Sequence, residues 1–163
     1  MEIKTIIVDD EQHALDSFVK IAEITCPEIK VVETFTKPDA LLEHLVKGEN
    51  PDLLFLDIEM TPYSGFRLVE LLQEKNKSLP DFDIIFLTAY DQYALQAFDV
   101  HALDYLLKPF DDRRFADALG RAGDHGDLAV ERIDLRPQAA RIERLARDGV
   151  GLGDLGGTAT GVL

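Results

Sequence analysis

Three aspartates follow short apolar runs in this sequence. Asp9 and Asp10 come directly after the apolar residues 6–8, and Asp57 comes directly after the apolar residues 53–56. Apolar runs of this length are typical of buried strands, which would place the carboxylates at strand ends. Crowded carboxylates repel one another and resist losing water, so such a site requires a hard cation or proton uptake. The three acids therefore predict a cation-dependent chemical site.

The elements that must position these acids are indicated by periodicity. The strand candidates are residues 5–8, 30–35, 53–56, 84–87 and 105–107. Between them, apolar residues recur at helical spacing, so each helix has one face to bury. Thr36 and Pro38 predict the start of the second helix, with the threonine hydroxyl as its cap, and Gly48 predicts its end. Asp111 or Asp112 is expected to open the last helix. This alternation predicts an α/β fold with a parallel sheet covered on both faces.

A five-stranded doubly wound sheet of this kind commonly has the strand order 2-1-3-4-5. In that order the first and third strands are neighbours, and ligands bind beyond their carboxyl ends. Asp9, Asp10 and Asp57 would then converge although they are far apart in the sequence. The fourth and fifth strands would bring Thr88 and Lys108 to the same edge.

Length and composition set limits on the function. A chain of 163 residues that is 46% hydrophobic can bury one full core, with some residues left over. A net charge of -14 disfavours nonspecific binding to DNA or anionic membranes. The single cysteine, Cys26, excludes an internal disulfide, and we find neither a signal peptide nor an apolar run long enough to span a bilayer. These features predict a cytoplasmic protein without membrane association.

The composition changes near the end of the last predicted helix. All eight lysines lie at or before Lys108, eight of the nine arginines follow it, and nine of the eleven glycines lie from Gly120 onward. We therefore divide the chain into a domain of residues 1–121 and a Gly- and Arg-rich tail or linker of residues 122–163. Within this tail, residues 138–147 are compatible with a short amphipathic helix, and residues 149–163 are expected to be disordered or loosely packed.

Five motifs in a fixed order resemble those of a response regulator receiver domain. They are Val8-Asp9-Asp10-Glu11, then Leu56-Asp57-Ile58-Glu59-Met60 with Gly65, Leu87-Thr88-Ala89, Tyr105, and Lys108-Pro109. The resemblance covers roughly residues 1–121, and the order of several motifs makes it more specific than any single match. It implies the flavodoxin-like receiver fold. Residues 97–110 are further similar to receivers of the LytTR class, which usually carry a DNA-binding output domain.

The sequence departs from that class in two places. The 44 residues from Gly120 are too few for its β-rich output domain, although residues 141–145 faintly resemble the start of one. We therefore expect a missing or truncated output domain and no direct nucleic-acid binding by this chain. Thr61 stands where receivers usually have proline, and Pro62 follows one residue late, so the loop after Asp57 is expected to differ in shape.

The resemblance implies a phospho-accepting site, position by position. Asp57 would accept a phosphoryl group from a sensor histidine kinase, with Mg²⁺ neutralising the repulsion between carboxylate and phosphoryl group. Asp10 and Asp57 would contact the ion directly, and Asp9 mainly through a water molecule. Glu59 would contribute its backbone carbonyl, and residues at the places of Glu59 and Tyr90 tune how readily water attacks the acyl phosphate. Beyond phosphotransfer to itself and autodephosphorylation, no enzymatic activity is expected.

The same resemblance implies a switch. Lys108 would pair with Asp57 at rest and with a phosphoryl oxygen afterwards, and its peptide bond to Pro109 resembles the cis bond of the family. Thr88 would donate its hydroxyl to the phosphoryl group, and Tyr105 would then move from an exposed to a buried position. The face formed by the fourth helix, fifth strand and fifth helix would repack. This face is expected to bind a partner or to support a homodimer.

Other interpretations stay open at this point. The domain could act as an unphosphorylated scaffold, or pseudo-receiver. Residues 57–61 superficially resemble the nucleophile loop of haloacid-dehalogenase-like phosphohydrolases, but that family places its nucleophile after the first strand and its paired acids late. Flavin binding on a flavodoxin-like fold would need loops that hold a phosphate, and this sequence lacks suitable ones. The three acids at the switch point would also repel a phosphate. The four histidines lack metal-ligand spacing, so no zinc site is expected.

Overall fold

The computed structural model describes residues 2–76 and 81–122. Its strands are β1 (Ile3–Val8), β2 (Ile29–Phe35), β3 (Leu53–Asp57), β4 (Asp83–Thr88) and β5 (Asp104–Leu107). Its helices are α1 (Gln12–Thr25), α2 (Pro38–Val46), α3 (Gly65–Asn76), α4 (Ala94–Asp99) and α5 (Asp112–Ala122), with a 3-10 turn η1 (Asp91–Tyr93) before α4. All neighbouring strands are parallel, in the order β2-β1-β3-β4-β5. The predicted α/β fold and strand order are confirmed.

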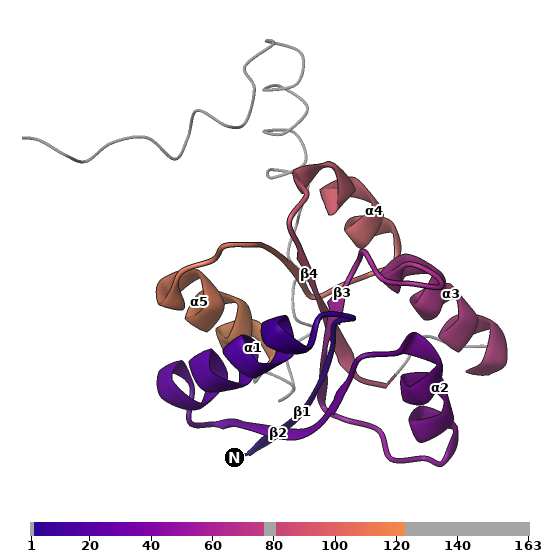
Figure 1. Ribbon diagram of the computed structural model, residues 1–163, viewed down its shortest axis with the longest axis horizontal. Helices are drawn as coiled ribbons and strands as arrows, with labels where there is room; N and C mark the ends of the chain where they lie inside the picture. Colours follow the sequence, from indigo (N-terminus) through magenta and orange to yellow (C-terminus); the bar gives the residue numbers. More distant parts are fainter. Residues whose placement is uncertain (1, 77–80, 123–163) are drawn as a thin grey trace, which may run out of the picture.

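The sheet lies between two layers of helices. Helices α1 and α5 cover one face, and α2, α3 and α4 cover the other (Figure 1). Successive residues of a strand point to opposite faces, so a central strand that is covered on both sides must be apolar throughout. In β3, Leu53 and Phe55 pack on the α1 and α5 side, whereas Leu54 and Leu56 pack on the α2 and α3 side. The unbroken apolar runs of the sequence follow from this two-sided burial.

The strand register aligns the carboxyl ends at one edge of the sheet. Val8 of β1 is opposite Leu56 of β3, so Asp9 and Asp57 follow at adjacent positions. Thr88 of β4 is opposite Leu107 of β5, and the backbone N–H of Lys108 donates to the carbonyl of Thr88 at 2.7 Å. The sheet thereby places residues from four separate segments around one edge.

Helix termini follow the predicted signals with one exception. The cap of α2 is Lys37, which makes no side-chain cap hydrogen bond, so the expected capping role of Thr36 is wrong. Proline disfavours helical dihedrals in the residue before it, which explains why the extended cap falls on Lys37, next to Pro38. Gly48 adopts a φ of 84° after α2, a conformation that favours glycine. At α5, the Asp111 carboxylate accepts a hydrogen bond from the Arg114 backbone N–H at 2.7 Å.

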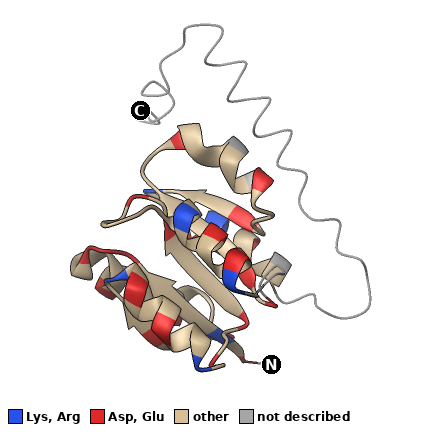
Figure 2. Cartoon of the chain, turned by 90° about the vertical axis from the view of Figure 1, so that its right-hand side faces the viewer, with Lys and Arg blue, Asp and Glu red and all other residues tan. Residues whose placement is uncertain are grey.

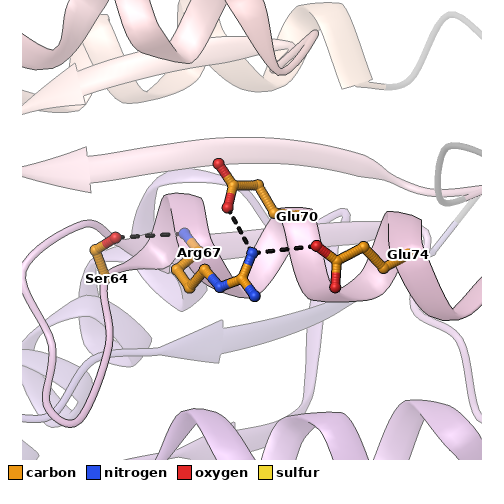
Figure 3. A network of polar contacts seen from close by, with 4 residues as sticks. All are labelled: Ser64, Arg67, Glu70 and Glu74. Atoms are coloured by element: carbon orange, nitrogen blue, oxygen red, sulfur yellow. Dashed lines mark hydrogen bonds and ion pairs between the residues drawn. The ribbon is translucent and has the colours of Figure 1, made fainter.

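Helix α3 carries an exposed polar network (Figure 3). The Ser64 hydroxyl accepts a hydrogen bond from the backbone N–H of Arg67 at 3.3 Å. The Arg67 guanidinium contacts Glu70 at 2.9 Å and Glu74 at 3.2 Å. Exposed ion pairs are screened by water and contribute little. The position of α3 therefore depends mainly on its buried residues, which include Leu68.

Acidic residues occur on several helices, strands and loops (Figure 2).

Within residues 2–76 and 81–122, no helix has the length and apolar character needed to cross a bilayer. The predictions for the tail, a helix at residues 138–147 and disorder or loose packing at residues 149–163, concern residues outside the described ranges.

Candidate functional site

Asp9, Asp10 and Asp57 converge at the carboxyl ends of β1 and β3. One carboxylate oxygen from each lies within 4.8 Å of the others. Asp9 and Asp57 are buried, whereas Asp10 is exposed. A cluster of hard oxygen donors with one solvent-facing member has the donor chemistry that Mg²⁺ requires, because this ion binds a few carboxylates and keeps several waters.

Asp57 is a member of the triad with a raised pKa. Burial raises the pKa of Asp57 to about 6; the ammonium of Lys108 opposes the rise and the negative charge of Asp9 adds to it. Hydrogen bonds to the carboxyl from the backbone of Glu59 and Ile58 also favour its charged form. The ionised group therefore lacks full compensation, and an added cation would stabilise it.

The ammonium of Lys108 is shared unequally between two carboxylates. Its Nζ lies 2.7 Å from Asp9 Oδ2 and 3.8 Å from Asp57 Oδ2, so the closer partner is Asp9 and not the expected Asp57. Asp9 is held in place because its other oxygen, Oδ1, accepts a hydrogen bond from the Glu11 backbone N–H at 2.9 Å. The peptide bonds Lys108-Pro109 and Thr61-Pro62 are both cis.

Thr88, Tyr90 and Tyr105 form a connected polar chain beside the triad. Thr88 is fully buried, and its Oγ1 accepts a hydrogen bond from the Tyr90 backbone N–H at 3.1 Å. The Tyr105 hydroxyl donates to the Tyr90 carbonyl. Tyr105 is only 6% exposed, so it lies in the buried position and not in the exposed position expected before phosphorylation. The ring joins the apolar cluster on the α4 side of the sheet, and the Tyr90 carbonyl satisfies its hydroxyl.

Gly65 allows α3 to approach the carboxyl end of β3 closely. A Cβ atom at this position would lie 2.3 Å from the Asp57 carbonyl oxygen, which is too close for any side chain. The Gly65 backbone N–H donates to the Ile58 carbonyl at 2.9 Å. Gly65 thus fixes the backbone from which the Asp57 side chain extends. The sequence analysis grouped Gly65 with the motif around Asp57 but did not predict that it packs against the Asp57 backbone.

The loop after β3 has two tyrosine contacts that sequence reasoning missed. The Tyr93 hydroxyl donates to Glu59 Oε1 at 3.2 Å, and both residues line a pocket of about 490 Å³ that also includes Asp10. The Tyr63 hydroxyl donates to Asp39 of α2 at 2.6 Å. Burial, followed by this bond to Asp39, raises the pKa of Tyr63 to about 12. Neither contact has a local sequence signal, because the partners are far apart in the chain.

Comparisons with known proteins agree with this architecture. The family model described as the response regulator receiver domain matches residues 5–120. The chain is 44% identical over 117 residues to the sensory transduction protein LytT of Bacillus anthracis, which covers 72% of this chain and 46% of that protein. It is 39% identical over 121 residues to the transcriptional regulatory protein BtsR of Shigella flexneri, covering 73% and 47%. The chain spans about half the length of these curated relatives.

Solved structures show the same fold. The response regulatory domain of mrkE from Klebsiella pneumoniae is similar with a TM-score of 0.65 and 27% identity, covering 74% of this chain and 95% of that one. The response regulator TrrA from Thermotoga maritima, solved in complex with Mg²⁺ and BeF, has a TM-score of 0.61 and 27% identity, covering 75% and 99%.

Proposed function

The chain belongs to the response regulator receiver family, and we propose that it accepts a phosphoryl group on Asp57 from a sensor histidine kinase in a Mg²⁺-dependent reaction. In this step the bond from phosphorus to the kinase histidine nitrogen breaks, and a bond from phosphorus to an Asp57 carboxylate oxygen forms. The observation that carries the proposal is the convergence of Asp9, Asp10 and Asp57 with Lys108 at one edge of the sheet.

The described residues fit Mg²⁺. The three carboxylates supply hard oxygen ligands, and the raised pKa of Asp57 indicates that its charge is incompletely balanced by the protein alone. In our proposal Asp10 and Asp57 hold the ion directly, Asp9 does so mainly through water, and Glu59 contributes its backbone carbonyl. Bound Mg²⁺ supplies charge neutralisation between the nucleophile and the phosphoryl group. The Mg²⁺ and BeF complex of TrrA supports this choice of ion.

Lys108 and Thr88 then stabilise the new phosphoryl group. The ammonium of Lys108, which already lies within 3.8 Å of Asp57, transfers its contact to a phosphoryl oxygen. Thr88 Oγ1 accepts the Tyr90 N–H, so the hydroxyl hydrogen of Thr88 stays available to donate to the phosphoryl group. Asp57 must be ionised to attack, and a pKa of about 6 leaves most of it ionised at neutral pH.

The signal leaves the site through the face of α4, β5 and α5. On it Tyr105 joins β5 to the loop after β4, and Leu107 of β5 is a large exposed residue, 41% accessible. In our proposal this face forms a homodimer or binds the output of the longer protein, and that output is transcriptional. The name of BtsR, a transcriptional regulatory protein, supports the last point. Histidine kinases take their phosphoryl group from ATP, which places the reaction in the cytoplasm.

The test is intact-mass spectrometry after incubation with acetyl phosphate, with and without Mg²⁺. The variant is Asp57→Asn, and the matched control is Asp52→Asn, which removes an exposed carboxylate just before the other end of β3. We expect one added phosphoryl group that requires Mg²⁺, persists in Asp52→Asn and disappears in Asp57→Asn. A parent chain that gains no phosphoryl group under any condition would contradict the proposal and favour the scaffold interpretation.

A further inference from the structure

A buried carboxylate also lies outside the carboxylate triad. Asp104, the first residue of β5, is 0% exposed, and the Arg114 guanidinium of α5 approaches both of its oxygens. Arg114 Nη2 lies 2.6 Å from Asp104 Oδ1, and Arg114 Nη1 lies 2.8 Å from Asp104 Oδ2. The hydrogen bond to Asp104 raises the pKa of Arg114, so the guanidinium keeps its charge. The structure thus holds a bidentate ion pair between β5 and α5.

Simple packing does not require such a pair. Burying the charge of Asp104 and part of the charge of Arg114 costs free energy of desolvation, and an apolar pair of similar size often stabilises a protein equally well. A bidentate arginine does provide fixed geometry, because its planar fork matches the carboxylate in one orientation. Arg114 is itself fixed, since its backbone N–H donates to Asp111 at the start of α5. The pair is therefore suited to holding a neighbouring group in one position.

That neighbouring group is the backbone of Tyr105. Its N–H donates to Asp104 Oδ1 at 2.7 Å, and its carbonyl accepts a hydrogen bond from Arg114 Nη2 at 3.0 Å. Both backbone polar groups of Tyr105 are thus bonded to the two members of the ion pair. From this fixed backbone the ring extends to the Tyr90 carbonyl, and the Tyr90 N–H leads on to Thr88. A continuous series of hydrogen bonds joins the first turn of α5 to Thr88.

We propose that Arg114 is a positioning residue for Tyr105: with Asp104 it fixes the Tyr105 backbone so that the ring stays inward, and it thereby couples α5 to Thr88. The inference rests on the proposed function in that Thr88 is taken to contact the phosphoryl group. In the absence of the Arg114 fork, the β5 backbone gains freedom and the Tyr105 hydroxyl leaves the Tyr90 carbonyl more often. By linkage, the site then binds a phosphoryl group less tightly.

The first experiment reports the position of the Tyr105 ring without any phosphoryl group. The full chain is labelled with 3-fluorotyrosine, and the Tyr105 fluorine resonance among the four tyrosines is assigned with Tyr105→Phe. The variant is Arg114→Lys, which keeps the positive charge beside Asp104 but cannot form the fork. The matched control is Arg113→Lys, which makes the same change at an exposed residue of the same turn.

We expect the H₂O-to-D₂O shift of the Tyr105 resonance to increase in Arg114→Lys, because the ring becomes more exposed, and to stay at the parent value in Arg113→Lys. An Arg114→Lys protein that is less stable but has a Tyr105 resonance identical to that of the parent would overturn the inference. This outcome does not depend on phosphorylation, so it is separate from any failure of the proposed function.

The second experiment measures coupling to the site, with beryllofluoride and Mg²⁺ as the probe. We expect Arg114→Lys to weaken beryllofluoride binding by about fivefold, within the range of coupling between contacting residues. In a Tyr105→Phe background the same substitution should have no further effect, since the hydroxyl that transmits it is gone. Independent, multiplicative effects of the two substitutions would overturn the inference. A parent chain that does not bind beryllofluoride would contradict the proposed function, and the fluorine experiment would then decide on Arg114.

Discussion

Lys108 Nζ lies 2.7 Å from Asp9 and 3.8 Å from Asp57, so the resting protein directs its ammonium mainly to the carboxylate that is not the proposed nucleophile. Asp57 is left partly uncompensated, and burial dominates its raised pKa. The arrangement leaves the nucleophile dependent on an added cation. It also keeps Lys108 close enough to contact a group attached to Asp57 after a short movement.

Lys108→Gln is expected to slow phosphorylation by acetyl phosphate roughly 100-fold, because a fixed group that stabilises developing charge is removed. Lys47→Gln, an exposed change at the end of α2, serves as the control and should match the parent. The rate is followed by intact-mass spectrometry at saturating Mg²⁺. A Lys108→Gln rate within twofold of the parent would show that the ammonium has no part in the transfer.

The stability of the metal-free protein should depend on pH through Asp57. Its pKa rises from 3.8 to about 6 on folding, so the folded state binds the proton more tightly than the unfolded state. The resulting contribution to the free energy of unfolding is fully present below about pH 4 and is lost as pH rises through about 6. At 1.36 kcal/mol per pKa unit, the loss amounts to roughly 3 kcal/mol.

Asp57→Asn removes this ionisation. In buffer with EDTA we expect the variant to exceed the parent in stability at pH 7 and to approach it at pH 4, as measured by denaturant unfolding. A difference between variant and parent that stays constant from pH 4 to pH 7 would contradict the assigned ionisation.

Gly65→Ala is expected to destabilise the fold by about 1–3 kcal/mol, because the new Cβ would meet the Asp57 carbonyl at 2.3 Å and the backbone would have to shift. Gly120→Ala is the matched control, since a Cβ there meets nothing within 4 Å and α5 should tolerate or gain from alanine. Denaturant unfolding of both variants gives the comparison. Equal stability of the two variants would remove Gly65 from the account of Asp57 positioning.

Tyr90→Ala is expected to shorten the lifetime of the acyl phosphate, since the half-exposed Tyr90 ring would shield the phosphoryl group from water. Tyr90→Phe keeps this bulk and should retain the parent lifetime. The loss of the phosphoryl group is followed by mass after the phosphodonor is removed. An unchanged or slower loss in Tyr90→Ala would end the shielding hypothesis.

The sequence was sufficient for the fold and for the convergence of the site because both depend on strand-length apolar runs and strand order. Once β1 and β3 are neighbours, Asp9 and Asp57 must meet whatever their separation in the chain. Strand order did not predict which carboxylate lies closer to the Lys108 ammonium. Two carboxylates lie within its reach, and the choice of Asp9 depends on the orientation that the Glu11 backbone imposes.

The position of Tyr105 and its supports were likewise beyond sequence reasoning. A tyrosine at a strand end can be exposed or buried, and here the presence of an acceptor at Tyr90 and the clamp of Asp104 with Arg114 decide between the two. The contacts of Tyr105 with Tyr90 and with Arg114 join residues fifteen and nine positions apart, and no local periodicity encodes them. The sequence shows only that Arg114 follows Asp104 by ten positions, and this spacing alone does not predict that the two side chains meet.

The central claim is that Asp57 is the phosphoryl acceptor, and reduction of the acyl phosphate tests it most directly. The chain is incubated with acetyl phosphate and Mg²⁺, unfolded and treated with borohydride, which converts a phosphorylated aspartate to homoserine, and its peptides are then sequenced by mass spectrometry. The account predicts homoserine at position 57, and none there when Mg²⁺ is omitted. Homoserine at Asp9 or Asp10, or at no aspartate of the treated chain, would contradict it.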